Sequence, residues 1–200
     1  MTLAIQGSSI DGEAYQDVVA VAHHSPGWLD DVVSIWAAYG LAVFAVLMAV
    51  GWWRARRVSA AAALMALAVP VAVLVAFAAD AGLKLVVREH RPCQSLRVST
   101  LEACPAPGDW SFPSNHAAIA AAAAVALFFV SRWLGTVAAA AACAMAASRV
   151  WVGVHYPHDV VVGVLVGAVV AFGSMSVLRR RPEGLARRLS TTWLRPILVS

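Results

Sequence analysis

The sequence predicts an all-α protein, a polytopic membrane helical bundle of about five transmembrane helices preceded by an N-terminal surface helix. Of its 200 residues, 61% are hydrophobic and only 13% are charged, and the mean hydropathy is +0.75. Soluble domains average about 25% charged residues. The apolar residues gather in runs close to the ~20 residues that a helix needs to cross the hydrocarbon core. The length fits a single membrane-embedded domain over residues 1–200.

The elements follow in order along the chain. Residues 1–27 are expected to be an interfacial segment in which residues 11–24 form a surface helix, because apolar residues recur there at helical spacing. A Ser-Pro-Gly break at 25–27 ends this segment. A kink is expected at Pro70, inside the second span. We predict spanning helices over residues 29–53, 59–88, 115–133, 135–149 and 157–178.

Arginine positions predict the orientation. Arginines cluster at 54–57, after the first predicted span, and again in the tail at 179–200. Cytoplasmic flanks of membrane helices are rich in Lys and Arg. We therefore expect a multi-pass protein of a bacterial plasma membrane, with a basic cytoplasmic tail over 179–200 and with the N-terminus and the 89–114 loop outside. These flanks, which also suit contact with membrane lipids, account for the net charge of +4, so no nucleic-acid partner is expected.

The first segment with unusual polar residues contains Lys84 and Arg91, which lie seven positions apart and share a helix face. Two cations at the end of a membrane helix are costly, and on the outer side they also oppose the positive-inside rule. A bound phosphate would offset this cost, since Arg grips phosphate oxygens in a bidentate fork and Lys acts as a point charge. The alternative is that both side chains only reach out to water.

The second segment reads Phe-Pro-Ser-Asn-His over residues 112–116 and leads into an Ala-rich run. Ser114 is a good helix N-cap, and the free N–H groups of a first turn form an anion site. The Ser114 hydroxyl and the Asn115 amide would add donors, and His116 could give a proton. The alternative is an ordinary cap beside an interfacial histidine.

The third segment supplies Arg149 as a further phosphate cation, followed by His155 and Asp159. Asp159 lies four residues after His155 and can hydrogen-bond one imidazole nitrogen, which fixes the tautomer and leaves the other nitrogen free to attack. The alternative is a structural pair that caps the last helix.

A zinc site is a competing interpretation, and its ligands would come from His90, His116, His155, His158 and Asp159. Three fixed cations nearby would repel a divalent ion, so no metal is expected.

Cys93 and Cys104 lie in one expected outer loop, where disulfides can form, so we expect a bridge there rather than two free thiols.

Together the three segments resemble the type 2 phosphatidic acid phosphatase superfamily, which also contains soluble vanadium haloperoxidases. The family pattern is a Lys, six residues and Arg-Pro; then Pro-Ser-Gly-His; then Ser-Arg, five residues, His, three residues and Asp. The second motif departs from it, because Asn115 stands where the family has Gly, although Asn keeps the backbone N–H. The first and third motifs match at Lys84, Arg91, Pro92, Ser148, Arg149, His155 and Asp159.

The resemblance implies a metal-independent lipid phosphatase without a cofactor that acts through a phosphohistidine intermediate. His155 would be the nucleophile, Asp159 its orienting partner and His116 the general acid. Phosphate would be bound by Lys84, Arg91, Ser114, Asn115 and Arg149.

A polyprenyl diphosphate of undecaprenyl type is the expected substrate. Phosphatidylglycerol phosphate, phosphatidic acid and polyprenyl-phosphate sugars are the alternatives, as is a non-catalytic lipid-binding protein. The spanning helices disfavour a haloperoxidase. The motifs specify neither the lipid tail nor the oligomeric state.

Overall fold

The protein is helical in the computed structural model, which describes residues 6–96, 98–180, 182–193 and 195–198. Ten helices and no strand lie within these ranges, which confirms the predicted all-α class. The helices are α1 (Ser8–His23), α2 (Gly27–Tyr39), α3 (Leu41–Ala55), α4 (Ala60–Val86), α5 (Pro92–Ser95), α6 (Asn115–Phe128), α7 (Arg132–Trp151), α8 (Pro157–Leu178), α9 (Pro182–Leu189) and α10 (Arg195–Leu198).

Three helices, α4, α7 and α8, are long and apolar enough to cross a membrane. Helices α2 and α3 meet at an angle of 54° and would provide a fourth span if the bent pair crosses as one. The first predicted span, 29–53, is therefore two helices rather than one. The last predicted span, 157–178, has the same bounds as α8. Helix α4 continues through Pro70.

The third predicted span, 115–133, is shorter than expected, because α6 ends at Phe128. Its 14 residues cover about 21 Å at ~1.5 Å per residue, less than the ~30 Å of a hydrocarbon core. The helix ends early because Ser131 is extended (φ −159°, ψ 128°) and begins α7. By helix length and composition alone, three or four spans lie in the described residues, and the number of five stays a prediction.

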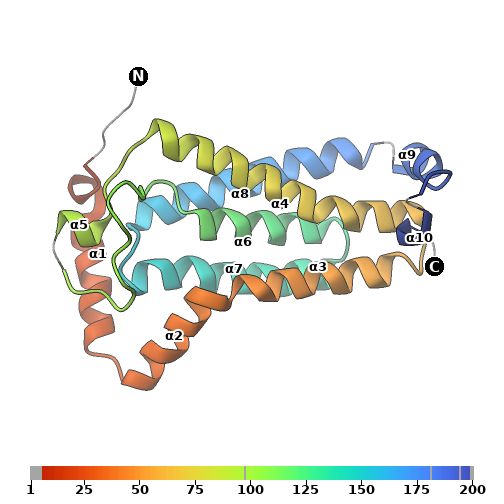
Figure 1. Cartoon of the computed structure of the whole chain (residues 1–200). Helices are drawn as coiled ribbons and strands as arrows, with labels where there is room; N and C mark the ends of the chain where they lie inside the picture. The colour runs from red at the N-terminus through yellow and green to blue at the C-terminus, as the bar shows by residue number, and fades with distance from the viewer. Residues whose placement is uncertain (1–5, 97, 181, 194, 199–200) are drawn as a thin grey trace.

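Helix α6 forms the centre of the bundle and lies between α4, α7 and α8 (Figure 1). Eight alanines and Leu127 are buried along it, as expected for a helix that is apolar on all sides. Helix α8 approaches α6 closely at Gly163, where a Cβ atom would lie 2.5 Å from the Ser114 carbonyl oxygen. This contact brings the first turns of α6 and α8 together.

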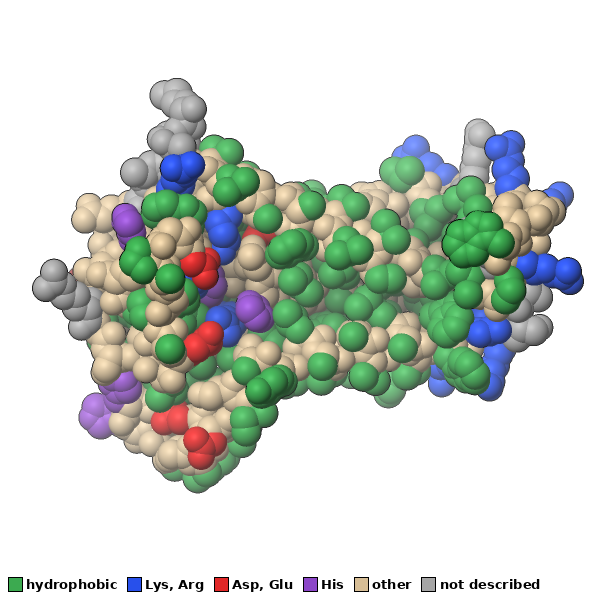
Figure 2. Space-filling view, viewed as in Figure 1, with side chains coloured by type: hydrophobic (Ala, Val, Ile, Leu, Met, Phe, Trp, Pro, Cys, Tyr) green, Lys and Arg blue, Asp and Glu red, His purple; other side chains and the backbone are tan. Residues whose placement is uncertain are grey.

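The two ends of the bundle differ in composition. Helix α1 crosses one end, where the Tyr15 hydroxyl donates a hydrogen bond of 2.9 Å to the Gly153 carbonyl. It begins three residues before the predicted surface helix. The opposite end carries α9 and α10, which pack on the start of α4 through Ala186 and Leu198. Figure 2 shows a largely hydrophobic middle, with Lys and Arg dominating the end at α9 and α10 and acidic and His side chains at the other.

Candidate active site

The three polar segments meet at the α1 end of the bundle, although they are far apart in the sequence (Figure 1). The end of α4 and the loop after it supply the first segment, and the start of α6 supplies the second. The end of α7 and the start of α8 supply the third. The backbone links two of them directly, because the Ser114 N–H donates a hydrogen bond of 3.0 Å to the Asp159 carbonyl.

His155 and Asp159 are both buried, at 2% and 0% exposure. His155 Nδ1 lies 3.4 Å from Asp159 Oδ2, and this same oxygen accepts hydrogen bonds from the Tyr156 N–H at 2.8 Å and from the Ser111 hydroxyl. Asp159 therefore both caps α8 and faces the imidazole, so its capping role is compatible with the predicted functional one. The Ser111 contact was not anticipated, since a lone serine in a loop carries no signal of this kind.

The other ring nitrogen of His155 fixes the tautomer. Arg91 Nη1 lies 3.3 Å from His155 Nε2, and a guanidinium can only donate. Nε2 must therefore be the acceptor, and the proton must be on Nδ1, facing Asp159. Burial, followed by the charges of Arg91, Arg149 and Lys84, holds the pKa of His155 well below its ordinary 6.5. The buried imidazole is neutral, and its Nε2 lone pair, which accepts from Arg91, is on the side of the cations.

Arg91 and Lys84 are held by the loop that precedes α6. Arg91 donates through Nε to the Asp109 carbonyl at 3.0 Å and through Nη2 to Asp109 Oδ1 at 3.0 Å. Its Nη1 also donates to the Val154 carbonyl at 2.9 Å, and Lys84 Nζ donates to the Trp110 carbonyl at 2.9 Å. These contacts hold both cations at the end of the bundle where His155 lies. They also pair the exposed carboxylate of Asp109 with Arg91.

Arg149 is buried at the end of α7 and also faces an acidic side chain. Its Nη1 donates to Glu102 Oε2 at 3.0 Å and to the Ala37 carbonyl at 3.4 Å. The side chain of Glu102 is 42% exposed. Two carboxylates that the motifs do not contain, Asp109 and Glu102, therefore form ion pairs with two of the three cations that are predicted to bind phosphate. Nothing in their local sequence predicted these contacts.

Polar atoms without protein partners lie at the start of α6. Ser114 is the N-cap residue, but its hydroxyl makes no capping hydrogen bond, and its Oγ and Asn115 Oδ1 are both buried without a partner among the described residues. The first N–H groups of a helix also lack intrahelical partners. The Ser114 hydroxyl and these N–H groups can donate to an anion, whereas Asn115 Oδ1 only accepts. The helix places His116 in its first turn.

The segment between α4 and α6 contains a disulfide between Cys93 and Cys104, the pair expected from the sequence. His90, one of the residues considered for zinc, is exposed, and its ring packs on Trp110 at 5.2 Å between centroids.

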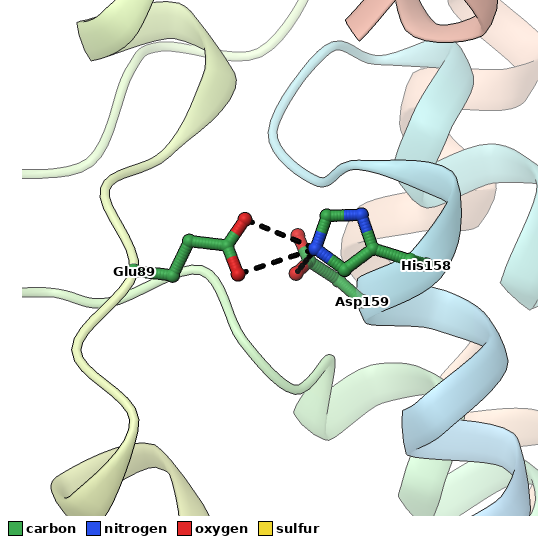
Figure 3. A group of neighbouring side chains, drawn as sticks. All are labelled: Glu89, His158 and Asp159. Carbon is green, nitrogen blue, oxygen red and sulfur yellow. Dashed lines mark hydrogen bonds and ion pairs between the residues drawn. The ribbon is translucent and has the colours of Figure 1, made fainter. Parts of the chain in front are cut away.

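A second polar cluster lies beside the first and was not predicted as a unit. Within the described ranges, Glu89, His158 and Asp159 form the group whose potential ligand atoms lie within 4.8 Å of one another (Figure 3). Glu89 is fully buried, and burial is the main cause of its raised pKa. This spacing alone would admit a cation, so these are the residues that could hold one. The zinc alternative had counted His158 and Asp159 but not Glu89.

Comparisons with known proteins agree with this architecture. The PAP2 superfamily matches residues 62–183. The chain is 29% identical over 160 residues to the undecaprenyl-diphosphatase BcrC of Bacillus subtilis, covering 80% of each chain. It is 35% identical over 135 residues to a decaprenylphosphoryl-5-phosphoribose phosphatase of Mycobacterium tuberculosis, covering 66% of this chain and 67% of that one. The crystal structure of Aquifex aeolicus LpxE shares its fold with a TM-score of 0.61 at 21% identity, over 87% of this chain and 99% of that one.

Proposed function

The chain belongs to the PAP2 superfamily and is a lipid phosphatase, and from this premise we propose that it hydrolyses a polyprenyl diphosphate of undecaprenyl type on the outer side of a membrane. The family resemblance read from the motifs is thereby confirmed. The proposal rests on one observation above the others. His155 presents Nδ1 to Asp159 and Nε2 to Arg91, which leaves Nε2 unprotonated and next to a predicted phosphate-binding cation, as a nucleophilic imidazole needs.

The proposed reaction has two steps. In the first, His155 Nε2 forms a bond to the terminal phosphorus while the bond from phosphorus to the bridging oxygen breaks, and His116 gives its proton to that leaving oxygen. In the second, water attacks the phosphorus and the N–P bond breaks. Inorganic phosphate is released, and His116 takes up the proton from the water. Asp159 stabilises the positive charge that develops on the ring of His155.

The cations take the charge of the transferring group. Lys84, Arg91 and Arg149 would contact its oxygens, with further hydrogen bonds from Ser114 and Asn115. In this proposal the phosphate replaces the carboxylates of Asp109 and Glu102 on the two arginines. Asp109 and Glu102 are 53% and 42% exposed, so both side chains have room to move away.

A lipid tail has a place beside Arg149. A groove of about 240 Å³ lies between α2 and α7 and is lined by apolar side chains, including Trp36 and Trp151. Ser148, the neighbour of Arg149, also lines it. A substrate with its phosphate on Arg149 could lay the first part of its tail in this groove, which suits a lipid better than a water-soluble phosphate ester.

The orientation is part of the proposal. The polar segments and the arginine-rich tail lie at opposite ends of the bundle (Figures 1 and 2). If the arginine-rich end is cytoplasmic, as the positive-inside rule predicts, the site faces outward.

Phosphate release from purified full-length protein in detergent, with a short-chain prenyl diphosphate and EDTA present, tests the proposal. The parent should release phosphate and be inhibited by orthovanadate, His155→Ala should abolish turnover, and Asp159→Asn should lower it less severely. His23→Ala is a matched control, because His23 is exposed on α1. Equal turnover of His155→Ala and the parent would refute the nucleophile assignment.

A polyprenyl-phosphate sugar is the second candidate substrate, because the Mycobacterium tuberculosis relative carries a name of that class. A panel of prenyl diphosphate, prenyl-phosphate sugar phosphate, phosphatidic acid and phosphatidylglycerol phosphate separates the alternatives through the ratio of kcat/KM values. Absence of phosphate release from all four would favour a non-catalytic lipid-binding protein.

A further inference from the structure

His158 lies between carboxylates on both sides of its ring. Its Nδ1 is 2.7 Å from Asp11 Oδ1, and its Nε2 is 3.0 Å and 3.2 Å from the two oxygens of Glu89 (Figure 3). A neutral imidazole has one donor and one acceptor nitrogen, whereas both nitrogens of an imidazolium donate. Since each nitrogen faces an ionisable acceptor, the contacts are satisfied together by the protonated ring.

The same ring faces the proposed partner of the nucleophile. His158 Nε2 lies 3.4 Å from Asp159 Oδ1, an oxygen that accepts no hydrogen bond from the described residues. The other oxygen of Asp159 faces His155. The Asp159 carboxylate therefore lies between two imidazoles, one on each oxygen, and is fully buried.

We propose that His158, held as an imidazolium by Asp11 and Glu89, is a positioning residue that offsets the charge of Asp159 and orients this carboxylate toward His155. The inference rests on the proposed role of His155 as nucleophile. A buried carboxylate needs a compensating partner. His158 supplies one from the side opposite the reacting ring, so that Asp159 can serve His155 with its other oxygen.

The N-terminal helix contributes to this arrangement. Asp11 Oδ2 accepts the backbone N–H of His158 at 2.7 Å, and Asp11 has non-helical torsion angles within α1 (φ −145°, ψ 31°). This residue lies outside the stretch 62–183 that matches the family. The first helix of this chain thus contacts His158, the neighbour of Asp159, twice through one side chain.

Other charged groups also surround Asp159. Lys84 and Asp80 act on it from α4, and Glu89 acts from the loop after α4. All three remain in place when only His158 is changed. A displacement of the pH profile between the parent and such a variant therefore reports the loss of the imidazolium itself.

The test compares His158→Phe with the parent, using phosphate release from a prenyl diphosphate between pH 5 and pH 9. Phe keeps a ring against Tyr156 and Phe112, whose centroids lie 5.5 Å and 6.0 Å from that of His158. Without a positive neighbour Asp159 takes up a proton more readily, so the acid limb of kcat should move upward by about one pH unit or more. On the acid side, each pH unit of this shift lowers kcat a further tenfold, while KM and the inhibition constant of orthovanadate stay near the parent values.

Further variants keep the outcome decisive. Asp11→Asn retains an acceptor for the His158 N–H but removes the negative charge. It should therefore shift the acid limb of kcat upward by a smaller amount than His158→Phe does. It also tests the inference if His158→Phe does not fold. His90→Phe is the matched control and should leave the profile unchanged, because His90 is exposed.

Two results would overturn the inference. One is an equal loss at every pH in His158→Phe, which would indicate a merely structural role. The other is a stoichiometric metal ion in the purified parent that is missing from His158→Phe, which would make His158 a ligand. A parent that is inactive on every lipid phosphate would instead refute the proposed function.

Discussion

Gly163→Ala offers a sharp test of how the α6–α8 contact positions the site. The added Cβ would lie 2.5 Å from the Ser114 carbonyl oxygen and 3.2 Å from the Ser114 nitrogen. Real Cβ atoms keep at least 3.0 Å, so the start of α6 must move by about half an ångström. A misplacement of 1 Å costs on the order of 10²-fold in rate, so half of it should lower kcat by about tenfold. Overpacking should also destabilise the fold by roughly 1–3 kcal/mol.

The assay is phosphate release at saturating substrate, combined with the midpoint temperature of thermal unfolding measured in the same detergent. Gly173→Ala is the control on the same helix, since a Cβ there meets nothing within 4 Å, and it should keep the parent kcat. Gly167→Ala clashes with the Ala118 carbonyl one turn deeper, so it should match the loss of stability with a smaller loss of kcat. If Gly163→Ala turns over like the parent, or if both clashing variants lose kcat equally, displacement of Ser114 is not the cause.

Three further predictions follow from the site. Glu102→Gln should lower the inhibition constant of orthovanadate by up to about fivefold, because a partly exposed ion pair with Arg149 contributes roughly 0.2–1 kcal/mol that the anion must replace; an unchanged constant would contradict this. Since the pKa of His155 is held well below 6.5, its neutral form persists as pH falls, so kcat/KM, corrected for substrate ionisation, should not decrease as the pH is lowered from about 8 to about 6. A loss centred near 6.5 would exclude that environment. After reduction, an impermeant thiol reagent should label Cys93 and Cys104 in intact cells of a strain whose variant lacks the remaining cysteine; labelling only after lysis would place this loop inside.

The sequence alone determined the helical class, the family and which residues to look for. Apolar runs and proline or glycine breaks are local signals, and they were enough to bound α8 at 157–178. The spacing of His155 and Asp159 is likewise local, because both lie at the first turn of α8. The expectation that Lys84 and Arg91 share one helix face is wrong, because α4 ends at Val86 and Arg91 is the N-cap of α5.

Local signals could not set the number of spans. The length of α6 depends on where Ser131 turns the chain into α7, and the 54° bend between α2 and α3 divides a run that is apolar throughout. An apolar run shows that a segment avoids water. It does not show whether lipid or protein surrounds it, which only the packing of the other helices decides.

The partners of the site were decided by the tertiary structure. Asp109 pairs with Arg91 and Glu102 with Arg149, while Asp11 and Glu89 contact His158. These partners are too far apart in the chain for helical spacing to predict the contacts. The motifs identify the groups that the chemistry needs, because those groups must be particular residue types at particular positions in the chain. Which acidic side chains balance the resulting charges depends on loop paths and helix crossings, and these are properties of the folded chain alone.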